Sequence, residues 1–315
     1  MFFGKSKRSH TVVIRPHNIN GNGFDLLVVK HLRSEEGRSL EVEDFLSDPE
    51  VSLSGALPDI VKECDLKRQH ATIVLPHSSY SHFTINRPNL PSDEIRKSLY
   101  WVSQDKLDNM PYHTPLLDSC FAPDILKGRE HNKMHVFVAE DSDVRKLYED
   151  VKKVGLKVDL VTVHEIATAS LLRHWSQSCV VCYIDIPLGD SPSLIIVLDG
   201  DFVAYKKLPS INKNVSVDVK RDQFVLFWAE VSRQLNYYKS NLDGEFQSKI
   251  YGYGESWNSL KNDLLFGEIF KDRFPTCKLE AITLGDVIVT DGLDAKMLLA
   301  IQHDLIGGAL INEKE

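Results

Sequence analysis

The stretch that decides the fold runs from Cys179 to Leu208 and reads CVVCYIDIPLGDSPSLIIVLDGDFVAYKKL. Its apolar runs predict three consecutive strands, over residues 180–186, 194–198 and 202–208. Prolines and a glycine separate the first two runs, and Asp199-Gly200 is a tight hairpin signal between the last two. Because a nearly unbroken apolar strand needs cover on both faces, we expect this meander to lie centrally in a covered sheet.

One acid, Asp185, stands near the end of the first of these strands and is followed by the turn formers Pro187 and Gly189. A carboxylate at the end of a buried strand, next to a turn, is typical of the ligand contacts of nucleotide-binding α/β folds. Asp185 is therefore the first candidate for a phosphate or metal contact.

Around the meander, strands and helices alternate along the chain, which is the pattern of an α/β protein. Strands are expected over residues 11–15, 24–32, 71–75, 80–86, 134–140, 158–163, 249–251 and 278–284. Helices are expected over residues 57–66, 92–107, 142–154, 164–172, 222–241, 258–270 and 294–305. The charged segment 33–55 predicts an exposed loop or a short acidic helix, and the proline-containing segment 109–132 predicts a long loop.

The composition of the 315 residues is that of a globular protein, with 43% hydrophobic and 26% charged residues, and the length allows two domains. The net charge of -8 argues against a nucleic-acid partner, because cationic residues gather only at the N-terminus. No apolar run approaches the roughly 20 residues that a membrane-spanning helix needs.

The motifs predict neither a metal site nor catalytic residues. Cys179 and Cys182 lie three apart on an expected strand and point to opposite faces, so we interpret them as buried small side chains. The twelve histidines lack a metal-ligand spacing with carboxylates, and each is interpreted as solvated or structural. No G-x-S-x-G elbow supports a hydrolase.

Three segments carry a family resemblance. They are IVLPHSSYSHFTINRPNLPSDEIRKSLYWVSQDKL (73–107), VFVAEDSDVRKLYEDVKKVGLKVDLVTVHEIATASLL (136–172) and FWAEVSRQLNYYKSNL (227–242). Their marks are R-P-x-L-P, S-D-E-I, A-E-D, V-G-L-K-V, H-E-I-A-T and E-x-x-R-x-L-x-Y-Y. With these marks the chain resembles the PilM/MshI family of type IV and mannose-sensitive haemagglutinin (MSHA) pilus biogenesis. The resemblance covers most of residues 11–280.

The resemblance implies an α/β, actin-like (ribonuclease H-like) two-lobed fold with an inserted α+β subdomain. The first lobe would comprise residues 11–80 and 164–174, the inserted subdomain residues 81–163, and the second lobe residues 175–315. The implied role is a cytoplasmic scaffold, peripheral to the inner membrane of a Gram-negative bacterium and in indirect contact with it. It would bind the N-terminal tail of a bitopic PilN-like (here MshJ-like) protein, together with other pilus platform proteins. The cytoplasmic domain of GspL in type II secretion is a more distant likeness.

The nucleotide site is where this sequence departs from the family pattern. Nucleotide-binding members open with a strand ending in D-I-G-[ST], whose acid organises Mg²⁺ and whose amides hold phosphate. Here the corresponding residues 15–18 read Arg-Pro-His-Asn, so the acid is missing and Pro16 has no amide N–H. The second phosphate turn keeps Asp185 but has proline in place of its first glycine.

The resemblance assigns the remains of the nucleotide site to five residues: Asn18, Asp185, Gly189, Gly252 and Gly254. Loss of an acid and two turn features removes most of the Mg-phosphate stabilisation that phosphoryl transfer requires. We therefore expect a degenerate cleft without hydrolysis and without a cofactor, while residual adenosine or Mg-ATP binding stays open.

The partner tail is expected in a groove between the inserted subdomain and the first lobe. The residues that flank these junctions are the candidates for contact: Tyr80, Arg87, Trp101 and His164. Two alternatives stay open, an active actin-like ATPase that closes on Mg-ATP and a GspL-like component of type II secretion.

Overall fold

The computed structural model describes the chain over residues 10–19, 21–34, 37–124, 126–173, 175–176, 179–186, 191–198, 200–212, 215–242, 247–284, 287–289 and 301–311. The chain divides into two compact units. The first unit comprises residues 1–121, 133–168 and 285–315, and the second comprises residues 122–132 and 169–284.

The first unit is built on a six-stranded mixed sheet with the strand order β14-β3-β2-β1-β4-β8. Its strands are β1 (His10–Pro16), β2 (Phe24–Ser34), β3 (Gly37–Asp48), β4 (His70–Leu75), β8 (Lys157–Val163) and β14 (Ile288–Val289). The strands β1, β4 and β8 run parallel, so their carboxyl ends share one edge, whereas β2 pairs antiparallel with β1 and β3. Its helices are α1 (Leu53–Glu63), α5 (Asp141–Lys153), α11 (His303–Leu310) and the first part of α6 (His164–Leu172), of which residues 164–168 belong to this unit.

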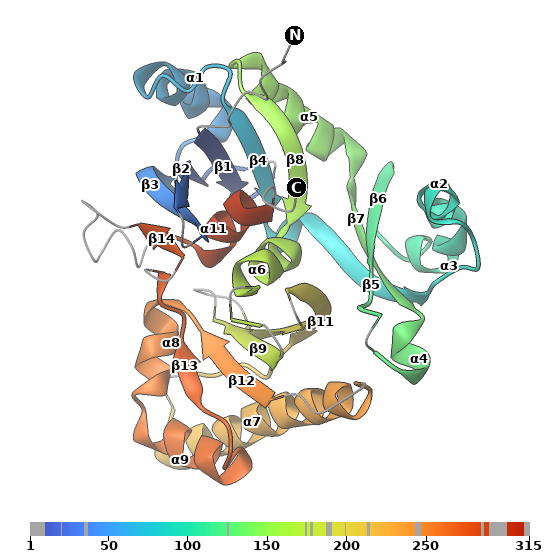
Figure 1. Cartoon of the computed structure of the whole chain (residues 1–315), viewed down its shortest axis with the longest axis vertical. Helices are drawn as coiled ribbons and strands as arrows, with labels where there is room; N and C mark the ends of the chain where they lie inside the picture. Colours follow the sequence, from blue (N-terminus) through green and yellow to red (C-terminus); the bar gives the residue numbers. More distant parts are fainter. Residues whose placement is uncertain are drawn as a thin grey trace. The chain divides into compact units, whose positions relative to one another are not determined.

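The helix α11 lies across β1 and β4, as Figure 1 shows. Two glycines permit this close approach. A Cβ on Gly307 would lie 1.9 Å from the carbonyl oxygen of Ala167 in α6, and one on Gly308 would lie 2.8 Å from the side chain of Val74. The described C-terminal elements β14 and α11 thus pack in the first unit, whereas the expectation placed them in a second lobe of 175–315.

The strand β3 corrects the expectation of a loop or short acidic helix over residues 33–55. It pairs with β2 along its whole length, and the register shifts by one residue at Val28/Val29, where the partners pass from Asp44 to Val42. Because this bulge reverses the alternation of buried and exposed side chains, Val42 and Phe45 are both buried although they are three residues apart. The period-two pattern of a strand is therefore broken in the sequence.

A three-stranded antiparallel sheet is inserted between β4 and β8, with the order β5-β7-β6. Its elements are β5 (Tyr80–Asn86), α2 (Ser92–Val102), α3 (Gln104–Leu107), β6 (Pro115–Phe121) and β7 (Lys133–Glu140). The buried side chains of Ile95 and Leu99 from α2 pack on Val136 and Val138 of β7. The edge strand β6 falls inside the expected loop 109–132, and β8 pairs with β4, so it belongs to the main sheet and not to the expected subdomain 81–163.

The second unit is built on a five-stranded sheet with the order β11-β10-β9-β12-β13. Its elements are α4 (Gly128–His131), β9 (Cys179–Asp185), β10 (Ser193–Leu198), β11 (Asp201–Lys207), α7 (Val217–Ser240), β12 (Gln247–Gly252), α8 (Gly254–Lys261), α9 (Leu264–Arg273) and β13 (Leu279–Ala281). Every residue of β10 is buried, and β9 is buried up to Asp185 and lies in the middle of the sheet, as its apolar sequence predicts.

The helices of the second unit cover the sheet through a cluster of large aromatic side chains. Trp228 of α7 lies 4.8 Å from Phe266 and 5.0 Å from Phe270 of α9, measured between ring centroids. The helix expected over 258–270 is two helices, because Asp263 begins a new one by accepting a hydrogen bond from the amide of Phe266. Most of the helix expected over 294–305 lies outside the described residues. Residues 303–305 of that range belong to α11.

Within the described part of the chain, no helix has both the length and the apolar character that crossing a membrane requires.

Candidate functional site

Charged and aromatic side chains gather at the carboxyl ends of β1, β4 and β8 in the first unit. We call this group the carboxyl-end cluster; its members are Arg15, His77, Tyr80, His164, Glu165, His303 and Asp304. Arg15 lies near the end of β1, His77 opens the short helix η1 (His77–Ser79) after β4, and His164 opens α6 after β8. In open α/β sheets, ligands bind at the carboxyl edge of parallel strands, so the topology singles this position out.

Asp304 is the anionic centre on one side of the cluster. It is fully buried in the first turn of α11 and accepts hydrogen bonds from Arg15 Nη1 at 2.9 Å and from His164 Nδ1 at 3.0 Å. Burial by itself would raise the pKa of Asp304, but the Arg15 guanidinium and the hydrogen bond from His164 hold that pKa far below its usual range. The positive end of the α11 dipole acts in the same direction.

Glu165 is the second buried carboxylate of the cluster. Its side chain is fully enclosed, accepts a hydrogen bond from the hydroxyl of Tyr80 and lies 3.1 Å from Nδ1 of His77. Burial alone would raise the pKa of Glu165; the hydrogen bond and charge of His77, with smaller contributions from His164 and Tyr80, bring it below the usual value. Both carboxylates are therefore held as anions.

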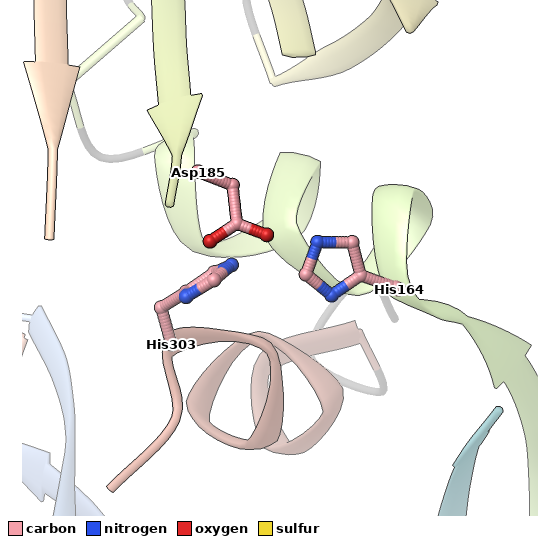
Figure 2. Close-up of side chains that lie close together, drawn as sticks. All are labelled: His164, Asp185 and His303. Carbon is pink, nitrogen blue, oxygen red and sulfur yellow. The ribbon is translucent and has the colours of Figure 1, made fainter. Parts of the chain in front are cut away.

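The two carboxylates fix the orientation of two imidazole rings. An ionised carboxylate only accepts hydrogen bonds, so Nδ1 of His164 is the donor in its contact with Asp304. Nδ1 of His77 lies 3.1 Å from the hydroxyl of Tyr80, and because that hydroxyl donates its own proton to Glu165, Nδ1 of His77 is the donor there. Nε2 is then the atom through which a neutral ring can accept a proton, a hydrogen bond or a metal ion. Figure 2 shows His164 at the start of α6 and His303 at the start of α11. Their ring centroids lie 5.1 Å apart.

The residues that the family resemblance assigns to a nucleotide site are divided between the two units. Asn18 is exposed in the turn after β1, where its carbonyl accepts the amide of Gly21 at 3.2 Å. In the second unit, Asp185 ends β9 and Gly252 ends β12. The two strands run parallel and Gly252 pairs with Ile184, so Asp185 and Gly252 lie at the same edge of that sheet. Gly254 begins α8 with φ of +87°. Gly189 lies outside the described residues.

Gly252 has a packing reason to be glycine. A Cβ at this position would lie 2.1 Å from the indole of Trp257, which is fully buried in the core of the second unit. Packing against Trp257 therefore explains why residue 252 is a glycine, without any ligand at the carboxyl end of β12.

The first turn does not fit the Mg-phosphate group that the fold family implies. Mg²⁺ prefers carboxylate oxygens, but β1 carries Arg15 next to its last residue, and the guanidinium of Arg15 already binds Asp304. Pro16 offers no amide to a phosphate, and Nε2 of His17 lies 3.1 Å from the carboxylate of Asp25. Arg15 and His17 are thus engaged within the unit itself, and no step of phosphoryl transfer can be routed through this turn.

The four residues expected to contact a partner separate into two pairs. Tyr80 and His164 are buried in the carboxyl-end cluster. Arg87 and Trp101 belong to the inserted subdomain, where the Arg87 guanidinium lies 4.1 Å from the ring centroid of Phe121 and 70% of Trp101 is exposed at the end of α2. Only the second pair presents side chains that a partner can reach.

Sequence reasoning missed four members of the cluster: His77, Glu165, His303 and Asp304. The pair Glu165 and His164 directly follows an expected strand, which is a signal that could have been used. His303 and Asp304 offered no such signal, because their partners lie 139 or more residues away in the sequence.

Comparisons with known proteins identify the fold. No family model matches the chain, and no curated protein matches it in sequence. A solved structure, the PilM-PilN type IV pilus biogenesis complex, aligns over 98% of this chain and 99% of that chain with a TM-score of 0.65 and 16% identity. The chain has the actin-like fold. This confirms the fold class expected from the sequence.

A further similar structure is the cytoplasmic domain of EpsL, an inner membrane component of the type II secretion system of Vibrio cholerae. It covers 98% of this actin-like chain and 96% of its own, at 12% identity and a TM-score of 0.48.

Proposed function

We propose that the chain is a PilM-like scaffold of a type IV pilus platform, of the MSHA kind, that binds the cytoplasmic tail of a PilN-like membrane protein. The observation that carries this proposal is the likeness to the PilM-PilN complex over almost the whole of both chains. The segments quoted above from the inserted subdomain, from α5 to α6 and from α7 support it, because they carry the family's sequence marks. The protein would act in the cytoplasm, held at the inner membrane through its partner.

We further propose that this scaffold does not hydrolyse nucleotides. The support is chemical: the first turn carries a cation where the family has an acid, and that cation is bound to Asp304 within the first unit. An Asp185 carboxylate alone, at the end of β9, would give Mg²⁺ one ligand where phosphoryl transfer needs a complete set of charge-stabilising groups.

The tail would be recognised on the inserted subdomain through Arg87 and Trp101. Trp101 offers a largely exposed apolar surface, and the Arg87 guanidinium, stacked on Phe121, offers hydrogen-bond donors on the same subdomain. Tyr80 and His164 would act indirectly, since their contacts with Glu165 and Asp304 hold the strand ends from which the subdomain departs.

The test is co-purification with the cytoplasmic tail of the PilN-like (MshJ-like) protein fused to a carrier. The unaltered chain should retain the tail, and the double variant Arg87→Ala, Trp101→Ala should lose at least tenfold in affinity while keeping its circular dichroism and Tm. Leu264→Ala is the matched control, because Leu264 is 84% exposed but lies on α9 of the second unit. If the double variant retains the tail as well as the unaltered chain does, Arg87 and Trp101 are not the docking surface. If the unaltered chain does not retain the tail, the proposed function is contradicted.

A further inference from the structure

His164 and His303 bring two imidazoles together from elements that are far apart in the sequence. Their ring centroids lie 5.1 Å apart at an interplanar angle of 78°, and each offers a ring nitrogen within 4.8 Å of the other (Figure 2). Both side chains are buried, with 7% and 3% of their surface exposed. Two zinc-bound imidazole nitrogens are roughly 3.3 Å apart, because each Zn–N bond is about 2.0–2.1 Å long and the angle is tetrahedral. To bind one ion, the two nitrogens, which lie within 4.8 Å of each other, must come to about that separation.

The groups behind these rings match those that support metal-bound histidines. A metal-ligating imidazole donates its other N–H to a carboxylate, which fixes the tautomer and strengthens the ligand. His164 does this through Nδ1, at 3.0 Å from the fully buried Asp304, so Nε2 is the ring nitrogen with the lone pair that can bind a metal. Asp304 is held in turn by Arg15 at 2.9 Å, so the carboxylate has a fixed position behind the ring.

The local sequence explains why His303 can share this environment. His303 and Asp304 are consecutive residues of the first turn of α11, so one helix end provides both an imidazole and the carboxylate that orients the other imidazole. The glycines that follow, Gly307 and Gly308, let α11 approach α6 and β4 closely enough for this arrangement. The pairing is therefore a consequence of how α11 is seated in the first unit.

We propose that His164 and His303 supply two ligands of a site for a divalent transition metal of the zinc class. Imidazole nitrogens suit Zn²⁺, Co²⁺ and Ni²⁺ better than Mg²⁺, which demands oxygen ligands. The first unit contributes two nitrogen ligands, and water or further donors complete the coordination of a four-coordinate ion. The proposal of this site does not rest on the proposed scaffold function.

The experiment is equilibrium dialysis of the tag-free full chain against Zn²⁺, followed by metal analysis and zinc-edge X-ray absorption. We expect about one Zn²⁺ per chain with two imidazoles in its inner shell, and an increase in Tm on metal addition. His303→Gln should weaken Zn²⁺ binding at least tenfold while circular dichroism shows the fold intact. Because His164 also binds Asp304, His303→Gln is the safer of the two variants.

A second histidine pair provides the matched control. His82 Nε2 lies 3.0 Å from His135 Nδ1 on the inserted sheet, with the rings stacked at 5.2 Å, so His82→Gln removes one ring of a close pair elsewhere in the unit. Zn²⁺ binding should survive this change. The proposal is overturned if the unaltered chain binds no Zn²⁺, if His303→Gln binds as well as the unaltered chain, or if His82→Gln alone abolishes binding.

Discussion

Arg15 and Asp304 lie 289 positions apart in the sequence and form an ion pair of 2.9 Å at the carboxyl edge of the main sheet, where Asp304 is fully buried. The pair joins the end of β1 to the start of α11. It also places a cation, whose charge Asp304 neutralises, in the turn where nucleotide-binding members of the PilM/MshI family carry an Mg-binding acid. This contact helps to seat α11, and it supports the proposal that the first turn does not bind Mg-phosphate.

Removing the charge of Asp304 should destabilise the first unit strongly. Asp304→Asn leaves Arg15 without its anion, and breaking a buried pair from one side costs about 3–5 kcal/mol. Thermal and urea unfolding, followed by fluorescence, measure the change. The control is Arg233→Ala, which removes an exposed pair with Glu230 one turn away on α7 and should cost less than about 1 kcal/mol. Equal losses in the two variants would contradict the assigned role of the buried pair.

Two helical glycines, Gly307 in α11 and Gly267 in α9, give predictions of opposite sign. In Gly307→Ala the new Cβ would lie 1.9 Å from the carbonyl oxygen of Ala167, so α11 must shift and stability should fall by about 1–3 kcal/mol. Gly267→Ala in α9 meets nothing within 4 Å, and alanine is a better helix former by about 1 kcal/mol, so this variant should be more stable. Melting curves of the two variants provide the comparison. A neutral Gly307→Ala would show that α11 does not need the close approach.

The main sheets could be predicted to a large extent because most of their strands are runs of apolar residues. Residues 194–198 are apolar throughout and residues 180–186 are apolar except for Tyr183 and Asp185, and these runs form the buried strands β10 and β9. β3 was missed for a physical reason: its bulge shifts the alternation between Val42 and Phe45, and acids lie between the buried positions. β6 was missed because an edge strand that buries few side chains carries little apolar signal.

The pH dependence of the second unit should report on Asp263. This residue caps α9 through the amide of Phe266 at 3.2 Å and pairs with Lys220 of α7. Burial would raise the pKa of Asp263, but Lys220 and the amide hydrogen bonds lower it below its usual value. A carboxyl whose pKa is lower in the folded state contributes stability above its unfolded pKa of about 3.9 and loses that contribution as the pH falls through its folded pKa.

Asp263→Asn separates this charge effect from the capping effect. Asparagine caps a helix about as well as aspartate, so the variant should keep α9 but lose part of the change in stability between pH 5 and pH 2. Asp263→Ala should lose the cap as well, at a cost of about 1 kcal/mol near neutral pH. Urea unfolding across this pH range measures both, and parallel stability curves for the unaltered chain and Asp263→Asn would contradict the assignment.

The candidate site was less predictable than the fold, because its groups meet only in three dimensions. His164 was selected from the sequence for its place at a junction, and it lies in the cluster, but its partner Asp304 is 140 residues away. Asp185 was selected for its place at a strand end, which the structure shows. Whether an acid at a strand end binds a ligand depends on neighbours that the sequence does not specify, and here the first turn offers Arg15 in place of an acid.

The most direct test of the proposed scaffold is calorimetric titration of the chain with the cytoplasmic tail peptide of its PilN-like partner, with and without Mg-ATP. We expect saturable binding of one peptide per chain without nucleotide. The Kd should change less than twofold on addition of Mg-ATP and in Asp185→Ala. Tail binding that requires Mg-ATP and disappears in Asp185→Ala would contradict the degenerate cleft, and no tail binding under either condition would contradict the scaffold itself.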